Sequence, residues 1–176
     1  MIDVLESIQP ISLRKRIKGE FFRMEFLYDK INIIKEDGKI IFEVEKTYKN
    51  QKKIIYKFII SIHYPYKSPD LYINNKNYGQ YLRCPNKFLN VLKYISNIEC
   101  FCCSSCTCPG NWTPSITLKY IIEESEYNSK IKHNIMIKIF LDQIKDKYLI
   151  SDINLDCWLF HIARPDVIKP GTKYLI

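Results

Sequence analysis

The chain has 176 residues, 47% of them apolar, and a formal net charge of +8 with a pI near 9.0. This length and apolar content are typical of one globular domain with a hydrophobic core, and they exclude an intrinsically disordered chain. The positive charge favours anionic partners. However, the basic residues are scattered and form no stripe with interleaved aromatics, so nucleic acid is not the expected partner.

No apolar run is long enough to span a membrane, and the N-terminus lacks the basic and apolar segments of a secretory signal. The seven cysteines are odd in number, and most lie too close together to staple distant loops. We therefore expect a protein that neither crosses nor binds a membrane and works in a reducing intracellular compartment, cytoplasmic or nuclear.

The N-terminal segment, residues 3–25, is predicted to be helical with an interruption at Pro10. Ser12 is a plausible N-cap for the second part. Apolar residues then recur at helical spacing, at Leu13, Ile17, Phe21 and Met24.

An antiparallel meander is predicted next. The Asp37-Gly38 pair between two apolar runs is a strong hairpin signal. Pro65 and Pro69 end a later β-rich run, because proline removes a donor from the ladder. The predicted strands are residues 31–34, 40–45, 54–63 and 71–73.

The second half is predicted to contain a loop over residues 74–86, a short helix over 87–94 and a cysteine-rich segment over 99–114. Thr113 and Pro114 are suited to begin a helix, with Ile116, Tyr120, Ile121 and Ile122 on its buried face. A last helix is predicted over 134–147. The fold class is therefore α+β, with a domain over 1–150 and an extension over 151–176 whose Trp158 and Phe160 pack on it.

The cysteine-rich segment, ECFCCSSCTCPGNWTP, is the candidate functional site. It holds Cys100, Cys102, Cys103, Cys106 and Cys108. One interpretation is a thiol nucleophile, which requires accessibility and a stabilised thiolate. A second is a metal site, and a third is a loop of packed free thiols.

The metal interpretation points to zinc, because thiolates are its usual ligands. The CxxC pairs Cys100/Cys103 and Cys103/Cys106 share a sulfur, so they cannot form two separate halves of one site. The candidate ligands are Cys100, Cys103, Cys106 and Cys108, and Cys84 or Cys157 could complete a set of four. If no metal is bound, we expect no cofactor.

Three segments around these cysteines resemble ubiquitin-conjugating enzymes and their UBC-like relatives. LRKRIKGEFFRM resembles the first helix of that family. YKFIISIHYPYKSPDLYI resembles its strand ending in a tyrosine-proline turn. NWTPSITLKYIIEE resembles its tryptophan-x-proline segment and the following helix. The resemblance covers residues 13–124 and implies a UBC-like α+β fold.

The resemblance implies that a cysteine carries ubiquitin or a ubiquitin-like protein as a thioester and passes it to a lysine. Spacing back from Trp112 ranks Cys103 first, then Cys100, then Cys102. The resemblance places Arg14, Lys15, Arg16 and Lys18 toward an activating enzyme, and Tyr64, Pro65, Trp112 and Pro114 near a ligase.

The sequence also departs from the family. Cys84-Pro85-Asn86 stands where the family has histidine-proline-asparagine, so Asn86 is the expected oxyanion donor. Residues 87–98 read as an insertion between Asn86 and the cysteines. An alternative is therefore a catalytically inactive UBC-like binding module, with or without a structural zinc site.

Overall fold

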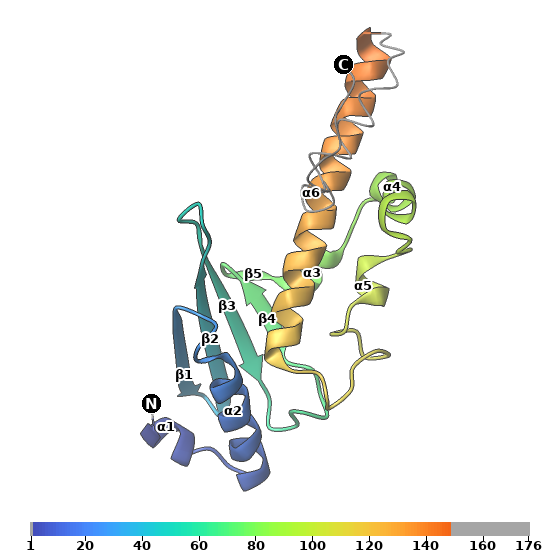
Figure 1. Ribbon diagram of the computed structural model, residues 1–176. Helices are drawn as coiled ribbons and strands as arrows, with labels where there is room; N and C mark the ends of the chain where they lie inside the picture. The colour runs from blue at the N-terminus through green and yellow to red at the C-terminus, as the bar shows by residue number, and fades with distance from the viewer. Residues whose placement is uncertain (1, 149–176) are drawn as a thin grey trace, which may run out of the picture.

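The computed structural model describes residues 2–148, which form an α+β fold (Figure 1). Two N-terminal helices precede a five-stranded antiparallel sheet, and four helices follow it. The elements are α1 (Ile2–Glu6), α2 (Ile11–Met24), β1 (Lys30–Glu36), β2 (Lys39–Thr47), β3 (Lys53–Ile60), β4 (Asp70–Ile73), β5 (Lys76–Asn77), α3 (Tyr78–Leu82), α4 (Asn86–Ser96), α5 (Phe101–Ser104) and α6 (Leu118–Tyr148).

The break at Pro10 is confirmed, since it separates α1 from α2. Proline suits a helix start because it cannot donate a backbone hydrogen bond. The N-cap predicted at Ser12 is wrong. The cap is Pro10, and α2 already begins at Ile11.

The sheet is a meander in which every strand pairs with its neighbour along the chain. The predicted hairpin is confirmed. Asp37 and Gly38 both have positive φ, as a tight two-residue turn requires. The register pairs Phe42 with Phe58, which places both aromatic side chains in the core. The strand predicted over 54–63 ends earlier, at Ile60.

The core lies between one face of the sheet and the buried sides of α2 and α6. Alternation along β3 buries Tyr56, Phe58 and Ile60, as period-two spacing dictates for a half-buried strand. Helix α6 contributes Leu118, Ile121 and other apolar side chains to the same cluster.

The second half differs from the prediction in three places. Residues 74–86 are not simply a loop, because they contain β5 and α3. Helix α6 begins at Leu118, after the Thr113–Thr117 segment, and runs for 31 residues without the predicted interruption. Tyr120 is 54% exposed and not on the buried face. The prediction for Trp158 and Phe160 lies outside the described residues.

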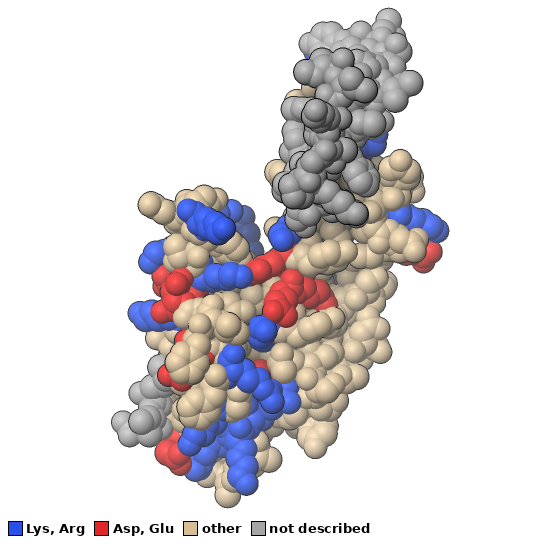
Figure 2. All heavy atoms as spheres, viewed as in Figure 1, with Lys and Arg blue, Asp and Glu red and all other residues tan. Residues whose placement is uncertain are grey.

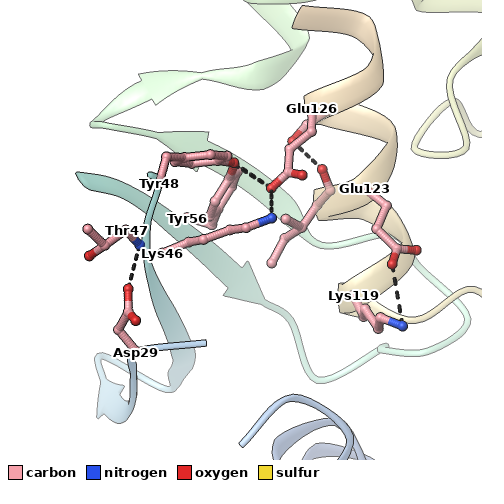
Figure 3. Close-up of polar contacts among 10 residues, drawn as sticks. Asp29, Lys46, Thr47, Tyr48, Tyr56, Lys119, Glu123 and Glu126 are labelled. Carbon is pink, nitrogen blue, oxygen red and sulfur yellow. Dashed lines mark hydrogen bonds and ion pairs between the residues drawn. The ribbon is translucent and has the colours of Figure 1, made fainter. Parts of the chain in front are cut away.

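A polar cluster on Glu126 ties α6 to the sheet (Figure 3). One carboxylate oxygen, Oε1, accepts hydrogen bonds from Lys46 at 2.6 Å, from Tyr48 at 2.6 Å and from Tyr56 at 3.2 Å. These donors come from β2, β3 and the turn between them, so the cluster fixes the angle of α6 against the strands. Within residues 2–148 no helix is long and apolar enough to span the bilayer.

Candidate functional site: a cluster of three thiols

The thiols of Cys100, Cys102 and Cys103 form a compact group, the thiol cluster, at helix α5. Their sulfur atoms all lie within 4.8 Å of one another. Cys100 is the extended residue that caps α5, and Cys102 and Cys103 lie in its single turn. The turn brings Sγ of Cys102 to 2.7 Å from Cys100 and 3.8 Å from Cys103. Cys102 and Cys103 are exposed and Cys100 is half-buried, so a reagent can reach the cluster.

The environment of the thiol cluster favours a thiolate at Cys100. A hydrogen bond from the Cys102 thiol lowers the pKa of Cys100, and the backbone N–H groups of Cys103 and Cys102 add to this. The same contact raises the pKa of Cys102 to about 11, because Cys102 acts as the donor. The two pKa shifts are opposite in direction because one thiol donates this hydrogen bond and the other accepts it.

The segment after the cluster is anchored to α6 through Glu124. Its Oε1 accepts a 2.6 Å hydrogen bond from the Ser105 hydroxyl, and its Oε2 accepts one of the same length from the backbone N–H of Cys106. Tyr78 donates to the same carboxylate at 3.1 Å. Phe101, 1% exposed, packs beneath the turn. These contacts fix the turn that carries the three thiols, residues 100–106, against α6. We call this fixed turn the thiol platform.

The other side of the platform is fixed by Asn111 and Trp112. The Asn111 amide donates to the backbone carbonyls of Cys103 and Ser105, at 2.7 and 3.0 Å. The Trp112 indole N–H donates to the carbonyl of Pro65 at 2.8 Å. The cysteine segment and the tyrosine-proline turn are thus joined directly.

The four candidate zinc ligands taken from the sequence are not brought together. Cys100 and Cys103 belong to the thiol cluster, whereas Cys106 and Cys108 are not part of it. Cys106 is 7% exposed, and burial together with the neighbouring Glu124 carboxylate raises its pKa. Cys84 is also outside the cluster, and Cys157 lies outside the described residues.

Asn86 lies at the start of α4, outside the cysteine segment. It is exposed at the first position of α4, and the rest of that 11-residue helix lies between it and the cysteine segment along the chain. Its side chain makes no hydrogen bond within residues 2–148. The expected insertion over 87–98 is largely this helix.

The four basic residues of α2 divide into two pairs. Arg14 forms an ion pair with Glu6 at 2.7 Å, and Arg16 forms one with the buried Glu20 at 2.8 Å. Lys15 and Lys18 are exposed and available to a partner. Basic side chains gather over α2 at the bottom of the molecule (Figure 2).

The four residues expected near a ligase differ in how exposed they are. Tyr64 is only 2% exposed, and its hydroxyl donates to Glu20 at 2.9 Å, so its side chain belongs to the core. Pro65 and Trp112 are half-buried against each other, and Pro114 is exposed. Pro114 is therefore the most accessible of this group.

Two carboxylates that organise the site were not singled out from the sequence. Glu20 is fully buried, and its Oε2 accepts the backbone N–H of Leu118, which positions the start of α6. Glu124 holds the thiol platform, as described above. For Glu20, the i,i+4 spacing from Arg16 is a local pattern that could have indicated an ion pair. For Glu124 no local pattern could have shown the partners.

Comparison of the chain with protein-family models, with curated proteins and with solved structures found no match in any of the three.

Proposed function

We propose that this chain is a divergent UBC-like protein that carries ubiquitin or a ubiquitin-like modifier as a thioester on the thiol cluster. The observation that carries the proposal is the cluster itself: accessible thiols on a held turn, one of them favoured as a thiolate. The α+β arrangement around it, with an N-terminal helix, an antiparallel meander and C-terminal helices, supports the same proposal.

Cys100 is the first candidate nucleophile on structural grounds, ahead of Cys103, which the spacing from Trp112 placed first. Nucleophilic attack requires a thiolate, and the hydrogen bond from Cys102 lowers the pKa of Cys100. Cys103 is exposed one helical turn away and is the second candidate.

The reaction is transthiolation followed by aminolysis. The Cys100 thiolate attacks the carbonyl carbon of the modifier's C-terminal thioester on the activating enzyme. The new carbon–sulfur bond forms as the old one breaks, and the activating enzyme's cysteine leaves as a thiolate. A lysine amine then attacks the new thioester, loses a proton to solvent and releases Cys100. This chemistry needs reduced thiols, so we propose an intracellular site of action, cytoplasmic or nuclear.

Partners follow from the same proposal. The exposed Lys15 and Lys18 on α2 would contact the activating enzyme, and the exposed surface around Pro114 would contact a ligase. Both surfaces lie beside elements held by Glu20, which links α2 to Tyr64 and to the start of α6.

The second candidate function is a UBC-like binding module without transfer activity. The position of Asn86 favours it, because the expected oxyanion donor is exposed and the rest of α4 lies between it and the cysteine segment along the chain. Loss of one such donor costs about 10²–10³ in rate in other enzymes. This module would bind the modifier or a conjugating partner and form no thioester.

The deciding experiment incubates the full chain with activating enzyme, ATP and ubiquitin, and follows adducts on gels with and without a thiol reductant. Wild type is expected to form a reductant-sensitive adduct that Cys100→Ser abolishes or converts to a reductant-resistant ester. Cys103→Ser tests the second candidate, and Cys108→Ser is the matched control. If no variant forms an adduct while the chain binds ubiquitin, the binding-module function replaces the enzymatic one.

A further inference from the structure

The thiol cluster has a second chemical property, which comes from its number of sulfurs and their spacing. A nucleophile needs one thiol, yet three sulfurs converge within 4.8 Å on an accessible turn. Two thiolates bound at about 2.3 Å to a tetrahedral Zn²⁺ lie about 3.8 Å apart. The Cys102–Cys103 separation is 3.8 Å and fits this spacing. The Cys100–Cys102 separation is 2.7 Å, so the Cys100 sulfur would have to move away from Cys102 for all three to bind one ion.

We propose that Cys100, Cys102 and Cys103 together bind one thiophilic d¹⁰ cation, with Zn²⁺ as the ion to test, through three thiolates and an open fourth position. Soft thiolate sets select such cations over Mg²⁺ or Ca²⁺. Three protein ligands with an open position are typical of reactive zinc sites, whereas structural sites are closed by four ligands.

Unlike a structural zinc site, this site is not required for the fold. The turn is already held without a metal, by the buried Phe101 ring and by the Ser105 and Cys106 hydrogen bonds to Glu124. Removal of the cation should therefore leave the fold intact. A zinc site on which folding depends would behave in the opposite way.

A further consequence, which rests on the proposed function, is that metal binding and loading of the modifier exclude each other. Cys100 cannot hold a metal ion and a modifier thioester at the same time, because both use its sulfur. Zinc would therefore compete with loading of the modifier, and Cys102 would be needed for that competition.

The metal site is tested by anaerobic titration of the reduced full-length chain with Co²⁺, whose thiolate charge-transfer absorption reports each sulfur ligand. The expected result is one Co²⁺ per chain, displaced by Zn²⁺. Cys100→Ser, Cys102→Ser and Cys103→Ser should each weaken binding by about tenfold or more, since each removes one thiolate bond. Cys108→Ser should titrate like wild type.

Two results would overturn the metal site: a wild-type titration equal to that of Cys102→Ser, or a loss of binding in Cys108→Ser as large as in Cys103→Ser. Circular dichroism with and without chelator checks that each variant stays folded.

Competition is measured as the ratio of thioester formed with and without Zn²⁺, within each variant. At a Zn²⁺ concentration that saturates wild type but lies well below what Cys102→Ser needs for binding, the ratio should fall in wild type and stay near one in Cys102→Ser. An equal fall in both variants would overturn competition through this site. Absence of any thioester would refute the proposed function and leave the Co²⁺ result standing.

Discussion

The indole N–H of Trp112 donates a 2.8 Å hydrogen bond to the backbone carbonyl of Pro65, across 47 residues of sequence. The Trp112 ring also lies 6.2 Å from that of Tyr64. These contacts close the cysteine segment against the end of the sheet. The two motifs on which the family resemblance rests, tyrosine-proline and tryptophan-x-proline, are therefore in direct contact.

Trp112→Phe is expected to destabilise the protein by about 1–2 kcal/mol, because it leaves the Pro65 carbonyl without its donor while keeping an aromatic ring. Urea denaturation followed by circular dichroism measures the change in the free energy of unfolding. Tyr120→Phe, at a side chain that is 54% exposed, is the control and should change it by no more than about 0.5 kcal/mol. Equal effects in both variants would mean that the indole bond contributes nothing.

Glu20→Gln tests the carboxylate that connects α2 to the start of α6. Glu20 is 0% exposed and lies 2.8 Å from Arg16, while Tyr64 and the Leu118 amide donate to it. Glutamine keeps the shape but removes the charge that compensates Arg16, a change that costs about 3–5 kcal/mol in fully buried pairs. Arg16 is 20% exposed, so we expect the lower end of this range.

The control for this variant is Glu25→Gln, at the exposed end of the same helix, which should change the free energy of unfolding by no more than about 0.5 kcal/mol. If Glu20→Gln is as mild as this control in urea denaturation, the buried ion pair is not part of what holds α6 in place.

Glu124→Gln tests how the thiol platform is held. Two charge-assisted hydrogen bonds of 2.6 Å weaken in this variant, and such bonds are worth about 1.5–3 kcal/mol each. We expect faster amide hydrogen exchange at Cys106, since its N–H is one of the two donors. Glu123→Gln is the matched control, because Glu123 is exposed and forms a surface ion pair with Lys119 at 3.4 Å. Unchanged exchange at Cys106 would contradict the anchoring role.

Much of the fold could be predicted because its signals are local. The Asp37-Gly38 turn and the alternation along β3 each specify structure within a few residues. The start of α6 was predicted wrongly at Pro114, where proline is compatible with a first helical turn but does not require one. The helix begins at Leu118 instead, where the buried Glu20 accepts the backbone N–H. That partner is 98 residues away in sequence.

The continuity of α6 was missed for a different reason. Residues 125–133 are mostly polar, which weakened the helical pattern, yet they contain no proline or glycine to end a helix. Polar residues such as Asn128 are instead satisfied by tertiary contacts, here a 2.8 Å hydrogen bond to the Tyr78 hydroxyl.

The sequence indicated which segment holds the closely spaced cysteines but not which of their thiols lie together. The CxxC spacings joined Cys106 to Cys100 and Cys103, and the candidate ligand set added Cys108. The actual group depends on one short turn, which turns Cys102 toward its neighbours while Cys106 is drawn inward to Glu124. Side-chain direction at such a turn follows from its tertiary anchors, and those are not visible in the spacing.

The Glu126 cluster predicts how stability depends on pH. Burial, then the hydrogen bond to Glu126, raises the pKa of Tyr48 from 10.0 to about 12. The folded state therefore holds this proton more tightly than the unfolded state. The contribution of Tyr48 to stability is fully present below pH 10 and is lost as pH rises toward about 12. Because the ring is only half-buried, the amount lost should be no more than about 1 kcal/mol.

Tyr48→Phe removes this titration. The variant should be less stable than wild type near neutral pH, because Glu126 loses a donor, and the difference should shrink by about 0.5–1 kcal/mol near pH 11. Urea denaturation at about pH 8 and about pH 11 measures both values. Tyr66→Phe, at a ring that is 82% exposed and outside the cluster, is the control. If the Tyr48→Phe difference stays constant with pH as in this control, the hydroxyl of Tyr48 is not held by Glu126 in solution.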